Sequence, residues 1–355
     1  MKKWNDSFLT DFLNETKKRQ PNFENFEKVL ACRKPERPTL FEFFLNDPLY
    51  LKLTGLDSMP KEPVGRARVV IKAYRNAGYD YCTMHASDFG FPHNLDQHGK
   101  KSRSMSEGAT ITCRGDFEKY KWPDPADYDT DRLAELAGDM PEGMKLIVYG
   151  PGGVLENVMQ LTGYEDLCYL LADDPDLVAE LFDHVGSRLV KYYELVSGYD
   201  IVGACISNDD WGFNTQTMLS TEDMRKYVFP WHKKIVETIH KSGRPAFLHS
   251  CGQLKEVYED VIEDMKYDGK HSFEDIIEPV ETLYGKLNPR IAVLGGIDVD
   301  FVCRSTPEEV YNRSCKMLEL TARRGGYALG TGNSVPAYVP DDQYIAMICA
   351  AIYNS

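Results

Sequence analysis

The stretch RPAFLHSCGQ, residues 244–253, places a histidine and a cysteine two positions apart at the end of a strand-like run. Side chains at positions i and i+2 of a strand point to the same side, so the His249 imidazole and the Cys251 thiolate are able to meet one ion. Zinc binds such groups at about 2.0–2.3 Å, and a catalytic zinc needs three protein ligands. The pair therefore predicts two ligands of a zinc site. In the alternative, His249 donates to a nearby carbonyl and Cys251 packs beneath the next helix.

The acidic segment SNDDWGFNTQ, residues 207–216, sets two carboxylates beside two aromatic side chains. Such carboxylates suit a metal ligand or a general base, because apolar surroundings penalise the charged form and raise the pKa. We therefore expect Asp209 and Asp210 to be catalytic, and Trp211 and Phe213 to wall a substrate pocket. The alternative is a capped turn before a helix over 220–241.

His271, in GKHSFED, is expected as a third zinc ligand or an acid–base group. The competing interpretation is a histidine hydrogen-bonded to Glu274 or Asp275 in the following helix. Three further polar residues at predicted strand ends are expected to bind substrate: Glu42, Thr331 and Asn333.

Eight short apolar runs alternate with helix-period segments along the chain, which is typical of parallel strands joined by helices. The strands are expected at 39–44, 79–84, 145–150, 200–206, 245–250, 267–273, 290–296 and 326–332. The helices are expected at 63–77, 154–198 in pieces, 220–241, 254–264, 274–285, 306–323 and 341–353. Ser220 or Thr221, and Thr306 followed by Pro307, are typical helix starts.

Eight βα units in a chain of this length predict an α/β fold of the (β/α)8 TIM-barrel type. In such a barrel the functional groups lie at the C-terminal ends of the strands, where the candidate site residues named above fall. Polar side chains also follow the second predicted strand, at His85, Ser87 and Asp88. A helical extension over 1–23 and a single barrel domain over 24–355 are expected.

The composition excludes several classes of function. A formal charge of −14 disfavours binding to nucleic acid, which needs a basic surface. The sequence has no run of about 18 uncharged apolar residues and no signal-like N-terminus, so no membrane association and a cytoplasmic location are expected. Nine cysteines without a CxxC pair argue against a disulfide framework.

The motifs YDYCTMHASDFGFP, FLHSCGQLKEV and GGYALGTGNSVPAYVPDDQYIAMI, in this order, resemble the uroporphyrinogen decarboxylase superfamily over about residues 24–353. The resemblance implies a (β/α)8 barrel that often dimerises, so a homodimer is an expectation. Asp88 matches the catalytic aspartate of the decarboxylase. Val158 and Thr331 stand where its tyrosine and histidine are expected, and Glu42 lies in the stretch that carries its arginines. A carboxylate there would repel a polycarboxylate, so uroporphyrinogen is not the expected substrate.

The closest motif match is to the zinc-dependent methyltransferases of this superfamily, which exchange methyl groups with corrinoid proteins. His249 and Cys251 match their HxC ligands, whereas Thr331 replaces the later cysteine, so a third ligand must come from Asp209, Asp210, His271 or Glu42. A site with one thiolate is harder and favours an oxygen substrate. The resemblance thus implies zinc-assisted demethylation of a small methyl donor such as an aryl methyl ether, with cobalamin carried by a separate corrinoid protein. The alternatives are a decarboxylase of a smaller acid and a non-catalytic barrel that binds a tetrapyrrole or corrinoid.

Overall fold

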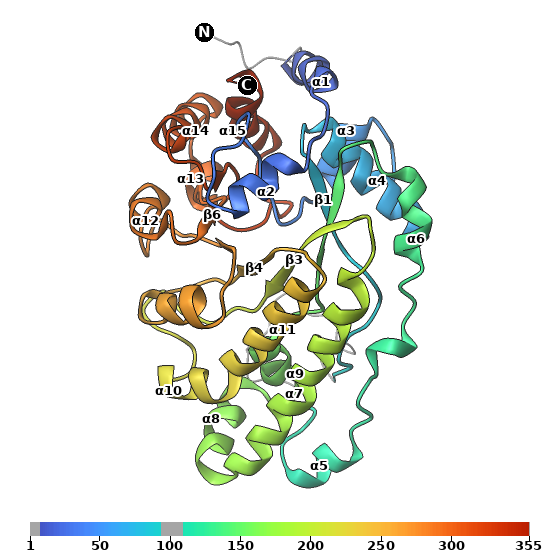
Figure 1. Ribbon diagram of the computed structural model, residues 1–355, viewed down its shortest axis with the longest axis vertical. Coiled ribbons are helices and arrows are strands. Elements are labelled where there is room, and N and C mark those ends of the chain that lie inside the picture. Colours follow the sequence, from blue (N-terminus) through green and yellow to red (C-terminus); the bar gives the residue numbers. More distant parts are fainter. Residues whose placement is uncertain (1–7, 94–108, 355) are drawn as a thin grey trace.

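The computed structural model describes residues 8–93 and 109–354, and a parallel sheet of seven strands forms its centre (Figure 1). The strands lie side by side in the order in which they occur in the sequence, and each adjacent pair is parallel. They are β1 (Tyr81–His85), β2 (Lys145–Tyr149), β3 (Val202–Asn208), β4 (Ala246–His249), β5 (Gly269–His271), β6 (Ala292–Leu294) and β7 (Tyr327–Ala328). This order is that of the predicted α/β barrel.

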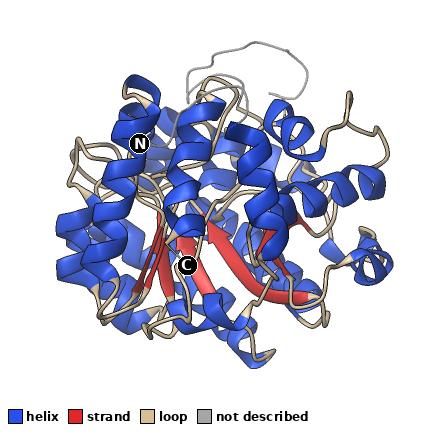
Figure 2. Cartoon of the chain, turned by 90° about the horizontal axis from the view of Figure 1, so that it is seen from above, coloured by secondary structure: helices blue, strands red, loops and turns tan. Residues whose placement is uncertain are grey.

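Helices lie outside the strands on several sides (Figure 2). They are α1 (Phe8–Lys18), α2 (Glu24–Leu30), α3 (Asp47–Thr54), α4 (Pro63–Asn76), α5 (Arg114–Lys119), α6 (Arg132–Leu136), α7 (Val154–Thr162), α8 (Tyr164–Asp173), α9 (Pro175–Ser197), α10 (Thr221–Asp223), α11 (Phe229–Lys241), α12 (Val280–Leu287), α13 (Val299–Arg304), α14 (Pro307–Thr321) and α15 (Asp341–Tyr353). A π-helical turn, Met224–Val228, joins α10 to α11. No helix among the described residues is long and apolar enough to cross a membrane.

The first predicted strand, 39–44, is the main departure from the expected strands. Only Leu40 of this segment forms a parallel bridge, with Leu329. On its other side the segment meets β1 through side chains: the Glu42 amide donates to the Tyr81 hydroxyl oxygen at 2.7 Å, and the Thr83 hydroxyl donates to the Phe43 carbonyl. Side-chain bonds thus replace the backbone ladder, so the segment fills the remaining position between β7 and β1 without being a regular strand.

Two predicted helices also differ. The helix expected at 274–285 begins only at Val280, because a proline at 279 disfavours helical backbone at the residue before it. The region 254–264 consists of a 3-10 turn, Lys255–Val257, and a π-helical turn, Asp260–Asp264. The predicted start at Ser220 is confirmed, since its hydroxyl accepts the Asp223 amide at 3.0 Å. Thr306 is likewise confirmed as the N-cap of α14.

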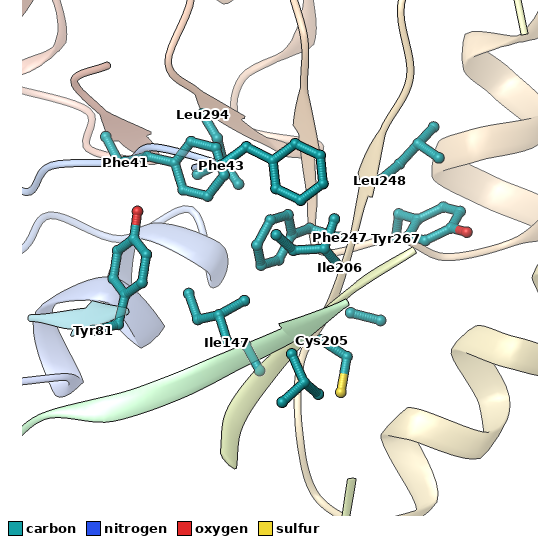
Figure 3. Packing of buried hydrophobic residues seen from close by; sticks show 14 of the residues in the cluster. Phe41, Phe43, Tyr81, Ile147, Cys205, Ile206, Phe247, Leu248, Tyr267 and Leu294 are labelled. Atoms are coloured by element: carbon teal, nitrogen blue, oxygen red, sulfur yellow. The ribbon is translucent and has the colours of Figure 1, made fainter. Parts of the chain in front are cut away.

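The barrel interior below the site is filled by fully buried apolar side chains. Figure 3 shows Phe41, Tyr81, Ile147, Ile206 and Phe247 pointing toward one another, whereas Leu248 and Cys205 point to the opposite side of their strands. Because side chains alternate along a strand, the residue two positions after each inward-facing one faces inward again. This alternation turns Tyr149, Asn208 and His249 toward the C-terminal mouth of the barrel.

Candidate metal site and adjoining cavity

Three potential metal ligands converge at the ends of β3 and β4. Their ligand atoms, one each from Asp210, His249 and Cys251, all lie within 4.8 Å of one another. His249 Nε2 is 3.9 Å from Cys251 Sγ and 3.9 Å from Asp210 Oδ1. Ligand atoms around a tetrahedral zinc are about 3.5 Å apart, so the two distances to His249 exceed that spacing by a few tenths of an ångström, and the cluster as a whole must contract from within 4.8 Å to hold an ion.

The loops after β3 and β4 hold these groups in place through several contacts. The Cys251 amide donates to Asp210 Oδ1 at 2.9 Å, and the Asp209 amide donates to the His249 carbonyl at 2.9 Å. Gly252 has a left-handed backbone with φ of 88°, and a Cβ there would lie 2.1 Å from the Gly212 carbonyl oxygen. A glycine is therefore required for the two loops to approach closely enough to share the site.

His271 fixes which nitrogen of His249 faces the cluster. His271 Nε2 lies 3.1 Å from the Thr331 carbonyl oxygen, which is able only to accept, so this nitrogen carries a proton. In a neutral ring the other nitrogen then has none, and His271 Nδ1 accepts from His249 Nδ1 at 2.8 Å. His249 Nε2 is consequently left with a free lone pair directed at Cys251 and Asp210. This is the tautomer that a metal ligand requires.

Thr331 and Glu42 form the far end of this chain of hydrogen bonds. The Thr331 hydroxyl donates to Glu42 Oε1 at 2.7 Å, and its amide donates to Glu42 Oε2 at 3.2 Å. Glu42 is fully buried, and burial raises its pKa to about 8. The Glu42 carboxyl group thus holds the Thr331 backbone, and the Thr331 carbonyl in turn orients His271. The Thr331 side chain is directed at Glu42.

Burial sets the protonation of the cluster. It lowers the pKa of His249 to about 3, with a further contribution from the Lys270 charge, so the imidazole is neutral at pH 7. Burial and the nearby Asp210 raise the pKa of Cys251 above its ordinary value, so the sulfur carries its proton in the absence of a metal. Asn333 Nδ2 donates to Cys251 Sγ at 3.3 Å and is suited to stabilise a thiolate there. The donor set of nitrogen, sulfur and oxygen therefore fits zinc.

Asp209 and Trp211, predicted as a catalytic base and a pocket wall, lie away from this cluster in the packed interior. Asp209 is fully buried and accepts the Leu155 and Glu156 amides at 2.9 Å each and His232 Nε2 at 2.8 Å. Its carboxylate thus holds the first turn of α7. Trp211 is also fully buried and packs against Phe229 and His232. The two residues join α7 and α11 to the end of β3.

A cavity of about 880 Å³ opens beside the cluster at the barrel mouth. It is lined in part by His85, Ser87, Asp88, Tyr149 and Asn208, of which Asn208 is the register partner of His249 on the neighbouring strand. Asp88 has 80% of its side chain exposed and forms an ion pair of 2.9 Å with Arg132.

A second cavity, of about 610 Å³, has in its wall Asn333, the residue that donates to Cys251 Sγ. Phe213 lines neither cavity; it packs against Tyr164 with ring centroids 5.8 Å apart.

Two residues of the large cavity were missed by the sequence analysis. Glu156 accepts the Gly153 amide at 2.9 Å, and burial followed by the charges of Asp209 and Asp210 raises its pKa to about 8. The glycine-rich turn with an acid three residues later was a signal for this helix start. Arg132 lies on α6, in a long connection after β1 for which the sequence suggested no element, so no signal marked it.

The parallel α/β barrel and the Asp–His–Cys cluster at its mouth together indicate a barrel protein with a candidate metal centre. The uroporphyrinogen decarboxylase (URO-D) family model matches residues 101–352, and the chain belongs to this family. The family and the URO-D-like barrel expected from the sequence are confirmed.

Two curated relatives illustrate the range of the family. The chain is 24% identical over 275 residues to the methylated-thiol–coenzyme M methyltransferase of Methanosarcina mazei, covering 73% of this chain and 71% of the relative. It is 22% identical over 255 residues to the uroporphyrinogen decarboxylase of Geobacter sulfurreducens, covering 67% of this chain and 69% of the relative. A solved methyltransferase structure from Methanosarcina mazei superposes with a TM-score of 0.67 at 11% identity, covering 92% of this chain and 97% of that one. The chain is an enzyme of this family.

Proposed function

We propose that the chain is a zinc-dependent methyltransferase that demethylates a small substrate such as an aryl methyl ether and passes the methyl group to the cobalamin of a separate corrinoid protein. The observation that carries this proposal is the Asp210–His249–Cys251 cluster, in which a histidine of fixed tautomer, a cysteine and a carboxylate converge at the barrel mouth. Similarity to a methyltransferase supports methyl transfer as the reaction type.

The residues present fit zinc, with His249 Nε2, Cys251 Sγ and an Asp210 oxygen as ligands. Zinc would supply Lewis-acid polarisation of the ether oxygen and would stabilise the departing phenolate or alkoxide. One thiolate with an imidazole and a carboxylate is a harder donor set than two thiolates, which supports an oxygen substrate over a sulfur one.

The chain's own residues bind the substrate and keep the ligands in position. Tyr149 and Phe43, which line the cavity beside the cluster, offer apolar faces on which an aromatic ring packs and excludes water. Asp210 stays aimed at the cluster because the Cys251 amide holds one of its oxygens. Asn333 donates a hydrogen bond to the Cys251 sulfur.

Methyl transfer to free cob(I)alamin tests the proposal. Purified protein reconstituted with zinc is incubated with cob(I)alamin and either methoxybenzene or 4-methoxybenzoate, and methylcobalamin is followed by its visible absorption. We expect turnover that is lost in Cys251→Ala and retained in Cys168→Ala, a matched control at an exposed cysteine. Transfer that survives both chelation and Cys251→Ala would rule out the role of the metal. If neither ether donates its methyl group to cob(I)alamin, the proposed reaction is contradicted.

A further inference from the structure

An aromatic wall runs through the large cavity and ends at the metal-site histidine. The ring centroids of His85 and Tyr149 are 4.1 Å apart, those of Tyr149 and Phe43 are 4.9 Å apart, and those of Phe43 and His249 are 4.4 Å apart. All of these residues except His249 line the cavity itself. The planes of neighbouring rings are tilted by 55° (His85 and Tyr149) and 74° (Tyr149 and Phe43), so a planar substrate that packs along this wall meets a mixture of ring faces and edges, with one end near the cluster and the other near His85.

Arg132 lies at the His85 end of this wall and has an unused hydrogen-bond donor. Its Nε donates to the Ala86 carbonyl at 2.6 Å, and its Nη1 donates to Asp88 Oδ1 at 2.9 Å. Nη2 is buried and has no hydrogen-bond partner among the described residues, although the residue lines the cavity. A buried guanidinium N–H without an acceptor is unfavourable, and a small rotation of the guanidinium that turns Nη2 into the cavity would let a bound acid group satisfy it.

The charges of the lining also favour an anion. Three cationic side chains, Lys61, Arg66 and Arg132, line the cavity together with two carboxyl groups, Asp88 and Glu156. Lys61 forms no ion pair within residues 8–93 and 109–354. Arg66 is paired with Asp47 and Arg132 with Asp88, so Lys61 supplies the positive charge of the lining that has no ion-pair partner among the described residues, in a chain whose formal net charge is −14.

We propose that the substrate is an aromatic methyl ether that carries a carboxylate, and that Arg132 binds this carboxylate while the ring lies on the His85–Tyr149–Phe43 wall. The assignment rests on the proposed function for the identity of the methoxy group, and it adds the acid group and its anchor. Asp88, which shares the guanidinium, competes with the substrate carboxylate and keeps Arg132 oriented in the empty cavity.

Calorimetric binding of two isosteric probes, 4-methoxybenzoate and the neutral 4-methoxybenzamide, to the purified protein tests the proposal. We expect the benzoate to bind at least tenfold more tightly than the benzamide, because a hydrogen bond to a charged group contributes a difference of about this size. Arg132→Gln should reduce benzoate affinity to that of the benzamide and leave benzamide affinity unchanged. Arg290→Gln, at an exposed arginine paired with Glu259 and Glu263, is the matched control and should change neither. Equal binding of the two probes by the wild-type protein, or binding of neither, would overturn the assignment.

Asp88→Asn provides a second test that does not depend on the folding of the Arg132 variant. Removal of the competing carboxylate should raise benzoate affinity severalfold while Arg132 keeps its bond to Ala86. An unchanged or lower benzoate affinity in this variant would contradict the role given to Arg132. Both measurements detect binding alone, so an enzyme that binds the benzoate as expected yet transfers no methyl group would refute the proposed reaction and leave the anchor intact.

Discussion

Replacement of His271 by phenylalanine should weaken zinc binding without removing a ligand. The variant loses the acceptor at 2.8 Å from His249 Nδ1 and leaves that N–H buried without a partner, which costs about 1–3 kcal/mol. The imidazole recovers part of this loss by turning, or by moving its proton to Nε2, and both changes oppose metal binding. Residues that orient a ligating histidine typically contribute about tenfold to hundredfold in metal affinity, and we expect a loss in this range.

Competition for zinc with a chromophoric chelator measures this effect, and the visible spectrum of the cobalt(II)-substituted protein reports the ligand geometry. His271→Gln is the conservative variant: its amide is able to accept from His249 and donate to Thr331, so it should restore most of the affinity. His240→Gln, at a histidine paired with Asp268 away from the cluster, is the control. An affinity within threefold of wild type in His271→Phe would refute the tautomer argument. A loss as complete as that of His249→Ala would instead make His271 a ligand.

Three further predictions follow from the protonation and burial of the site. Because burial raises the pKa of Cys251, zinc binding should release one proton per ion at pH 7, and the zinc affinity should rise about tenfold per pH unit between pH 6 and 8. Calorimetry in buffers of different ionisation enthalpy measures the number of protons released. Release of no proton would contradict a thiolate ligand. The pKa of Glu42 is raised from 4.5 to about 8, so the stability that its proton contributes is fully present below pH 4.5 and lost as pH rises toward 8. About 2 kcal/mol should disappear between pH 5 and 7 in denaturant unfolding, and a Glu42→Gln variant with the same pH dependence would argue against this assignment. Asp209→Asn should lower the free energy of unfolding by about 3 kcal/mol while the folded protein still binds zinc. Asp210→Asn should weaken zinc binding and leave the free energy of unfolding nearly unchanged. Equal effects of the two variants on stability and on zinc binding would contradict the separate positions of the two residues.

The order of the strands and the His249–Cys251 pair were predictable because both depend on short-range patterns. Alternation along one strand is enough to put residues 249 and 251 on the same side. The strand at 39–44 was predicted from its apolar residues, but whether a backbone pairs regularly depends on the neighbour, and here Tyr81 and Thr83 bond to it with side chains instead.

The rest of the site depends on contacts between residues far apart in the sequence. Asp209 and Asp210 are adjacent in a loop, and only the position of α7 decides that the first holds a helix while the second meets Cys251. The role of His271 required the position of the Thr331 carbonyl, 60 residues away in sequence. Arg132 reaches the cavity from a connection that carries no periodic pattern. Such placements are tertiary, so no local pattern could predict them.

The metal content of the purified protein tests the central claim most directly. Elemental analysis of wild-type protein, dialysed against zinc-free buffer after loading, should give one zinc per chain. His249→Ala and Cys251→Ala should each lose it, whereas Cys168→Ala should retain it. Folded wild-type protein that binds no zinc, or His249 and Cys251 variants that retain a full equivalent, would contradict the assignment of this cluster as a zinc site.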